Sequence, residues 1–205
     1  YRNFCKHLFS SCIMKKGDAR KLNLDKNSID LVVTSPPYIT SYEYAEIHQL
    51  STLWFGFAKN MSEIKEDFVG TSSRKSTEED FKSNIAKMII KDLYKKDKSL
   101  ARHASNYFSD LQKSYGEIYR VLKKRGIACI IIGNTEHRSV KIKNVEASLE
   151  LLRNIGFRSL KTIKRRLTSK NFTPFRDKEG RFTNSRKAAK KTIYKYEYIL
   201  VVRKE

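Results

Sequence analysis

Short apolar runs alternate with longer stretches of helical periodicity along this chain of 205 residues. The runs at 29–33 and 127–132 are too short for helices and rich in β-branched residues, so they predict buried strands. Residues from Phe157 onward and residues 193–202 predict the last two strands of the same sheet.

Between these strands, apolar residues recur at the three- and four-residue spacing of amphipathic helices. A first helix after Tyr38 is expected to pack on the sheet through Ile47, Leu50, Leu53, Trp54 and Phe57. A later helix is expected over residues 106–123, stopped by Gly126, with the apolar face Phe108, Leu111, Tyr115, Ile118, Tyr119 and Leu122. A third helix begins at the cap Asn144 and is closed by Gly156.

We expect residues 58–104 to form an inserted segment that lies mostly on the surface. Ser76 and Glu79 form a capping box there, ahead of a helical face made of Phe81, Ile85, Met88, Ile89 and Leu93. The alternation of strands and helices predicts an α/β fold, and the length fits one domain, 1–205.

The formal net charge is +21, from 43 Lys and Arg against 22 Asp and Glu. Such an excess favours a polyanionic partner, with nucleic acid ahead of an anionic membrane. Nearly half of it lies in a basic arm, residues 161–191, which holds twelve Lys and Arg against two acidic residues. Phenylalanines lie between these charges, as in segments that bind phosphates and stack on bases. The alternative is a solvated basic hairpin; the candidate DNA-binding residues are Arg165, Arg166, Lys170, Arg176, Arg181, Arg186 and Lys187.

The three cysteines are odd in number and form no CxxC pair, which indicates reduced thiols in a cytoplasmic protein. No apolar run is long enough for a membrane span. The four histidines lack the spacing of metal ligands, so no metal is expected.

The candidate chemistry lies in Thr34-Ser35-Pro36-Pro37-Tyr38, directly after the strand at 29–33. Adjacent prolines fix φ and supply no N–H, so the loop is stiff and its carbonyls are free to accept hydrogen bonds. The Ser35 hydroxyl and the Pro36 carbonyl would accept from the exocyclic amine of a base and favour a pyramidal, more reactive nitrogen. Tyr38 would stack on that base, which must first leave the double helix. The alternative is a strand followed by a rigid surface turn.

The segment Thr34–Tyr38 closely resembles motif IV of the amino-methyltransferases that use S-adenosylmethionine (SAM), and its Thr-Ser-Pro-Pro-Tyr form is similar to the cytosine-N4 branch. The resemblance implies a Rossmann-like class I methyltransferase fold, SAM as cofactor and DNA as partner, as in restriction–modification systems. It implies that Ser35, Pro36, Pro37 and Tyr38 are catalytic and that Thr34 lies near SAM. Methylation at cytosine C5 is excluded, because that chemistry resembles a thiolate mechanism built on Pro-Cys, and no proline here precedes a cysteine.

A strand expected over 7–16 leads into Gly17-Asp18, which resembles motif III of the same family. The acid of that motif contacts the adenosyl part of SAM, so Asp18 is the second expected cofactor-binding residue. Asp18 would lie at the carboxyl end of its strand, where open α/β sheets bind ligands.

The Gly-rich Phe-x-Gly-x-Gly turn of this family is absent, since no two of the eight glycines are two residues apart. In the family's strand order 3-2-1-4-5-7-6, the first two strands are therefore missing between strands 3 and 4. Such a gap would leave unpaired backbone groups facing water. Either upstream residues were removed, which Tyr1 in place of methionine favours, or a second polypeptide supplies the SAM-binding half.

These features predict the catalytic half of a SAM-dependent DNA amino-methyltransferase, most directly for cytosine N4 because Ser precedes Pro-Pro. Adenine N6 is the first alternative. A non-catalytic DNA-binding subunit that has lost SAM binding is another, and an RNA methyltransferase is a third.

Overall fold

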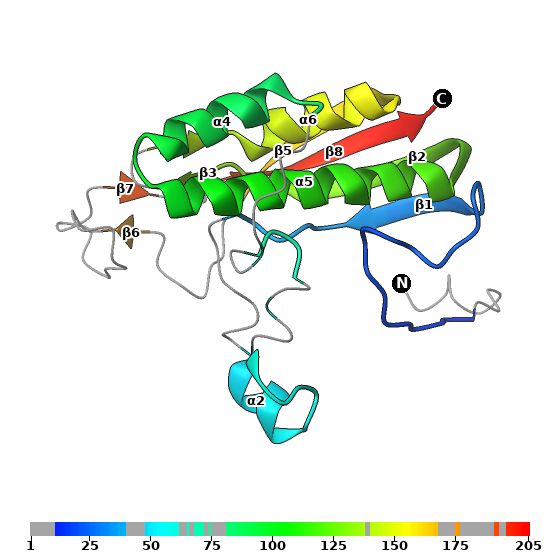
Figure 1. The fold of residues 1–205 in the computed structure, drawn as a ribbon. Coiled ribbons are helices and arrows are strands. Elements are labelled where there is room, and N and C mark those ends of the chain that lie inside the picture. The colour runs from blue at the N-terminus through cyan, green and yellow to red at the C-terminus, as the bar shows by residue number, and fades with distance from the viewer. Residues whose placement is uncertain are drawn as a thin grey trace.

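The computed structural model describes part of the chain: residues 11–39, 48–61, 65, 68–71, 74, 81–137, 140–167, 175–176, 191–192 and 196–205. A mixed sheet of four strands forms its centre, in the order β1-β2-β8-β5 (Figure 1). These strands span Ile29–Thr34 (β1), Leu122–Ile132 (β2), Phe157–Arg166 (β5) and Tyr196–Lys204 (β8). Only β1 and β2 run parallel; β8 is antiparallel to both β2 and β5. All four strands expected between 29 and 202 are therefore confirmed, and β1 lies at one edge.

Three helices cover one face of this sheet (Figure 1). They are α4 (Asn84–Tyr94), α5 (Lys98–Val121) and α6 (Asn144–Ile155). Short elements complete the described part: helix α2 (Gln49–Trp54) and the strand pairs β3–β4 (Thr135–His137 with Val140–Ile142) and β6–β7 (Phe175–Arg176 with Lys191–Thr192). The chain is thus α/β, as predicted.

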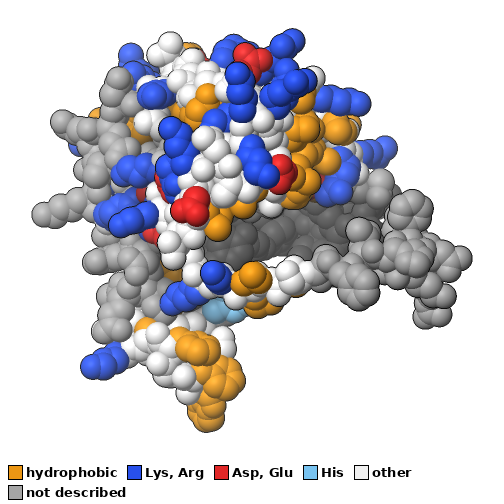
Figure 2. Space-filling view, turned by 90° about the vertical axis from the view of Figure 1, so that its right-hand side faces the viewer, with side chains coloured by type: hydrophobic (Ala, Val, Ile, Leu, Met, Phe, Trp, Pro, Cys, Tyr) orange, Lys and Arg blue, Asp and Glu red, His pale blue; other side chains and the backbone are white. Residues whose placement is uncertain are grey.

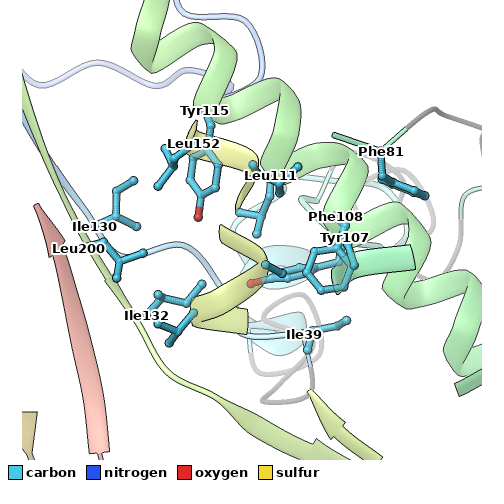
Figure 3. Close-up of a cluster of buried hydrophobic side chains, with 14 of the residues drawn as sticks. Ile39, Phe81, Tyr107, Phe108, Leu111, Tyr115, Ile130, Ile132, Leu152 and Leu200 are labelled. Atoms are coloured by element: carbon cyan, nitrogen blue, oxygen red, sulfur yellow. The ribbon is translucent and has the colours of Figure 1, made fainter. Parts of the chain in front are cut away.

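The core lies between the three helices and the sheet (Figure 3). Alternate residues of β2 and β8 point into it, because successive side chains of a strand face opposite sides. Ile130, Ile132 and Leu200 are fully buried there and meet Tyr115 and Leu111 from α5 (Figure 3). Within the predicted insertion at 58–104, α4 also contributes buried residues, namely Ala86, Ile89 and Leu93.

The start of α4 is fixed by two polar side chains. Ser83 is the N-cap, and its hydroxyl accepts from the Ala86 N–H at 3.0 Å. Glu150 of α6 accepts from the Ser83 hydroxyl at 2.6 Å and from the Ile85 N–H at 3.0 Å, which joins the two helices. The predicted capping box Ser76–Glu79 lies outside the described residues.

Several expected boundaries differ from the structure. Helix α5 begins at Lys98, eight residues before the expected start, because Asp97 caps it by accepting from the N–H groups of Ser99 and Leu100. It ends at Val121, and Gly126 lies inside β2 instead of stopping the helix. Gly156 closes α6 with φ of 121°, as expected.

Two expectations near the amino end are wrong. Residues 11–16 of the strand expected over 7–16 form no strand and are exposed; residues 7–10 lie outside the described part. The helix after Tyr38 does not pack on the sheet, since α2 has no buried residue and Trp54 is 81% exposed. Figure 2 shows apolar side chains gathered on this protruding segment, where Leu50, Trp54, Phe55 and Phe57 are exposed. Apolar periodicity predicted the helix but not what covers it.

Among the described residues, no helix is long and apolar enough to cross a membrane.

Candidate active site

The Thr34–Tyr38 segment lies at the carboxyl end of β1, beside the carboxyl end of its parallel neighbour β2. Thr34 is the last residue of β1 and is in register with Ile130 of β2, which continues to Ile132 before Gly133. Open α/β sheets bind ligands at this edge, because loops from parallel strands converge there. The fold therefore places the segment where a ligand site is expected.

The segment passes from an exposed to a buried environment along its length. Ser35 is exposed, Pro36, Pro37 and Tyr38 are half-buried, and Ile39 is buried in the core. Burial of Ile39 fixes the far end of the loop, and the strand β1 fixes its near end (Figure 3). The Ser35 side chain is thus presented to solvent from a loop that is held at both ends.

The Tyr38 ring lies against Gly133, the first residue after β2. A Cβ built on Gly133 would be 3.6 Å from Tyr38 Oη and 3.5 Å from the Tyr196 carbonyl oxygen. The ring also packs against the core cluster. The sequence singled out Tyr38 but assigned no role to Gly133, whose only signal was its position directly after a buried strand.

Tyr107 of α5 is a second residue that the sequence did not single out. It is fully buried, and its hydroxyl finds no hydrogen-bond partner among the described residues. Burial raises the pKa of Tyr107 well above its usual value, and the neighbouring Tyr115 and Tyr38 raise it further. Tyr107 therefore stays neutral, and it belongs to the core cluster against which Tyr38 packs. Phe108, beside it in sequence and expected on the apolar face, is buried as well.

The loop after β2 is tied to helix α6 by two asparagines. Asn134 Oδ1 accepts from the Val145 N–H at 2.8 Å, and Asn144 Nδ2 donates to the Gly133 carbonyl at 3.1 Å. Lys143, not the expected Asn144, is the N-cap position, and its side chain makes no capping bond. The start of α6 is satisfied instead by Asn134, from a loop ten residues earlier, which local sequence spacing does not reveal.

Asp18 lies in a turn whose carboxylate is held by Arg20. Arg20 donates from its backbone N–H to Oδ1 at 2.8 Å and from its guanidinium to both carboxylate oxygens at 2.8–3.1 Å. The guanidinium hydrogen bond lowers the pKa of Asp18, although partial burial opposes the shift. Arg20 also reaches Asp110 of α5 at 3.3 Å, so the turn is anchored to that helix. A ligand hydroxyl would share this carboxylate with Arg20.

The candidate DNA-binding residues are only partly within the described structure. Arg165 and Arg166 belong to β5, where Arg165 forms an ion pair with Glu197 of β8 and Arg166 is exposed. For Arg176 the structure describes only the backbone, in β6. Lys170, Arg181, Arg186 and Lys187 lie outside the described residues.

A surface hollow of about 540 Å³ lies at the other end of β1 and is lined by Asn27, Tyr119, Arg120 and Lys204, among others. It is separate from the Ser35 loop, because Asn27 precedes β1 whereas Ser35 follows it. The hollow therefore does not belong to the candidate active site.

A family model described as DNA methylase, of the N6/N4 kind, matches residues 29–205. The chain belongs to this DNA methylase family. The match begins at the first residue of β1 and includes the Thr34–Tyr38 loop, so the family assignment covers all four strands of the sheet. A search of the curated proteins finds no match.

Solved structures similar to this family member include TTHA0409 of Thermus thermophilus, provisionally named a DNA modification methylase. The selenomethionine derivative of TTHA0409 is 18% identical with a TM-score of 0.44, and its complex with SAM is 20% identical with a TM-score of 0.46. Both comparisons cover 92% of this chain but only 50% and 53% of TTHA0409. The chain thus spans about half the length of these structures, and the family assignment rests on the family model alone.

Proposed function

We propose that this chain carries the base-side half of the active site of a SAM-dependent DNA amino-methyltransferase, with cytosine N4 as the methylated atom. The proposal rests on the Ser35–Tyr38 loop, which lies at the carboxyl end of β1 in a member of the DNA methylase family. A Rossmann-like arrangement is consistent with the parallel pair β1–β2 and its helices on one face.

The loop would act on the exocyclic amine of a base that has left the double helix. The amine is a weak nucleophile because its lone pair is delocalised into the ring. The Ser35 hydroxyl and the Pro36 carbonyl would accept hydrogen bonds from its two hydrogens and favour a pyramidal nitrogen. Pro37 would keep the Pro36 carbonyl in place, because its fixed φ stiffens the loop. Most of the rate gain would come from this positioning.

Tyr38 would hold the base by stacking. Its ring is half-buried between the loop and Gly133, so its orientation is set before a base arrives. A ring held in advance costs less ordering on binding than a mobile one.

SAM, with which one of the similar structures is complexed, supplies a methyl group bonded to a positively charged sulfur. The residues described here fit only part of such a cofactor site. Thr34 is half-buried at the end of β1, whereas both oxygens of Asp18 are already bonded to Arg20. No Gly-rich turn occurs in the sequence. Thr34 and Asp18 therefore remain proposed SAM contacts.

The preference for cytosine N4 over adenine N6 rests only on the resemblance of the Ser-Pro-Pro form, with Ser35 before the two prolines, to the cytosine-N4 branch. Both amines have the same two hydrogens and would fit the same acceptors, so base choice depends on the walls of the pocket. The DNA would be held by the basic arm, whose charge suits the phosphate backbone.

The test uses the protein purified from its native host, together with any polypeptide that it binds. Duplex DNA and SAM with a tritiated methyl group are added, and the digested DNA is analysed for methylated nucleosides. We expect N4-methylcytosine, and a loss of at least a hundredfold in the variants Pro36→Ala and Tyr38→Ala with DNA affinity retained. If the product is N6-methyladenine, the target base is adenine and not cytosine. Unchanged activity in both variants would contradict the proposed active site. Folded protein that binds DNA but transfers no methyl group would favour the non-catalytic alternative.

A further inference from the structure

Residues 91–102 join α4 to α5 and carry more positive charge than they neutralise. We call them the α4–α5 corner; they hold five Lys and Arg against two Asp. Both carboxylates are already used within the corner. Asp92 pairs with Lys95 at 3.1 Å, and Asp97 caps α5 by accepting from two backbone N–H groups. The corner thus keeps an excess of positive charge after these contacts are made.

Three of the remaining cations have no partner in the described part of the chain. Lys91, Lys96 and Arg102 are exposed, and their side chains form no hydrogen bond or ion pair with a described residue. Like charges gathered on one surface repel one another and destabilise the compact state. The fold itself therefore gains nothing from these three charges, whereas an anionic partner would neutralise them.

The excess is local to the corner and is not spread over the helical layer. Helix α6 carries two acidic residues, Glu146 and Glu150, against Arg153. The rest of α5, residues 103–121, has two acidic and two basic residues. A surface charged only for solubility would not need to gather its cations at one connection. The distribution therefore favours a partner that binds at the corner.

An exposed aromatic ring lies among these cations. Tyr94, the last residue of α4, is 57% exposed, and the Lys98 amino group lies 5.5 Å from the centroid of its ring. Lysine, arginine and tyrosine side chains are among the groups that proteins use to bind the phosphates and sugars of DNA. Binding to a membrane surface needs a larger apolar area, and Tyr94 is the only large apolar side chain exposed in residues 91–102. The composition of the corner therefore fits a DNA backbone better than an anionic membrane.

The corner lies at the end of the molecule that carries the candidate active site. Strand β2 follows α5 directly and runs back beneath it, so the carboxyl end of β2 points towards the start of α5 (Figure 1). The parallel strand β1 points the same way, towards the loop that follows it. The β6–β7 pair, which is the described part of the basic arm beyond β5, lies at this end as well (Figure 1). A duplex that reaches the loop and the arm would therefore come close to the corner.

We propose that the α4–α5 corner is a second DNA-backbone contact, which holds the duplex together with the basic arm while one base reaches the Ser35–Tyr38 loop. The three cations without a described partner bind phosphates, and the Tyr94 hydroxyl donates to a phosphate oxygen. These contacts fix the position of the duplex and do not read its sequence. The inference rests on the proposed function only in taking DNA as the substrate, and it holds for either target base.

The first test is the salt dependence of duplex binding by the protein purified from its native host. In the corner variant, Gln replaces Lys91, Lys96 and Arg102. In the matched control, Gln replaces three exposed cations near the amino ends of β1 and β2, namely Lys26, Lys124 and Arg125. Both variants lose the same charge, and both should keep the circular dichroism and melting temperature of the wild type because the replaced side chains are exposed.

We expect the corner variant to flatten the slope of log affinity against log salt by about two to three units, since each lost phosphate contact removes about one. It should also bind duplex DNA at least tenfold more weakly at low salt. The control should keep the wild-type slope to within about one unit. An unchanged slope in the corner variant, or equal flattening in the two variants, would overturn the inference.

Photo-crosslinking gives a second measurement that does not depend on removing charge. The photo-reactive residue p-benzoylphenylalanine replaces Tyr94 in one variant and Lys124 in the control. With duplex DNA present, position 94 should form an adduct with DNA and position 124 should not. No DNA adduct at position 94, or an adduct there with a polypeptide in place of DNA, would contradict the proposed contact. DNA binding with the expected change of slope but without methyl transfer would count against the proposed function alone.

Discussion

The hydroxyl of Tyr38 lies 3.6 Å from the position that a Cβ on Gly133 would occupy, so the proposed stacking residue of one loop rests on the backbone of the next. These two residues follow neighbouring parallel strands. The relationship ties the orientation of the proposed base-stacking ring to the residue type at position 133.

The effect of a substitution at Gly133 should therefore depend on the size of the new side chain. In Gly133→Ala the new Cβ would make ordinary contacts of 3.5–3.7 Å, so stability and methyl transfer should change little. In Gly133→Leu the longer side chain would displace the Tyr38 ring, which should lower methyl transfer about a hundredfold and cost about 1–3 kcal/mol of stability. Thermal unfolding and single-turnover methyl transfer measure the two effects. Equal activity in both variants would mean that Tyr38 does not need this position.

Two buried tyrosines of α5 should respond differently to loss of the hydroxyl. Tyr115 Oη is 3.1 Å from Ser148 Oγ, so Tyr115→Phe should cost about 0.5–1.5 kcal/mol. Tyr107 has no hydroxyl partner among the described residues, so Tyr107→Phe should be neutral or stabilising. Chemical denaturation of the two variants compares them directly. Equal destabilisation would show that the Tyr107 hydroxyl bonds to a residue outside the described part.

The order of the strands and helices could be predicted from the sequence because the buried residues of these elements recur with a regular spacing along the chain. The runs at 29–33 and 127–132 became β1 and β2, and the apolar face with Phe108, Leu111 and Tyr115 became the buried side of α5. Sequence could not predict that residues 11–16 form no strand, because strand formation needs a partner edge. The prediction that the helix with Trp54 packs on the sheet was wrong for a similar reason, since apolar periodicity does not identify what covers a helix.

Within the candidate site, the sequence singled out the loop but not its supports. Thr34–Tyr38 is a contiguous stretch with chemistry in its residue types. Gly133 and Asn134 act through contacts distant in sequence, so a single sequence offers little signal for them.

The pairing of Asp18 with Arg20 should make the free energy of unfolding depend on pH in the acid range. The hydrogen bond from Arg20 lowers the pKa of Asp18 from its usual value near 3.8. The charged pair therefore stabilises the fold above that pH, and the contribution is lost as the pH falls through the lower folded value. Because the pair is partly exposed, Asp18→Asn should cost less than about 1 kcal/mol at pH 7, and the difference from wild type should disappear as the pH falls through the folded pKa of Asp18.

Urea denaturation at several pH values measures this difference, and SAM titration of the assembled protein separates the two roles of Asp18. A loss of SAM affinity above tenfold in Asp18→Asn, with stability within 1 kcal/mol of wild type, would support the proposed cofactor contact. Unchanged SAM affinity would leave Asp18 as an anchor of its turn only.

The basic arm should control the salt dependence of DNA binding. Each phosphate contact releases counterions, so removing contacts flattens the slope of log affinity against log salt by about one unit each. We expect this flattening, with affinity lowered by orders of magnitude, when Gln replaces Arg165, Arg166, Lys170, Arg176, Arg181, Arg186 and Lys187. A matched control with the same change in charge replaces seven exposed residues outside the arm: Lys15, Lys16, Lys21, Lys26, Lys124, Arg125 and Lys141. An unchanged slope in the folded arm variant would make the arm a solvated hairpin and move the DNA surface to residues 58–104.

We propose that the Ser35 side chain and the Pro36 carbonyl bind the amine that becomes methylated. Single-turnover methyl transfer by the natively purified protein, with Ser35→Ala against wild type, tests it most directly on duplexes that contain cytosine or N4-methylcytosine at the target. We expect a loss of about tenfold to a hundredfold in the rate with cytosine, unchanged DNA affinity, and no transfer to the premethylated duplex. Equal rates for Ser35→Ala and wild type, or equal transfer to both duplexes, would contradict it.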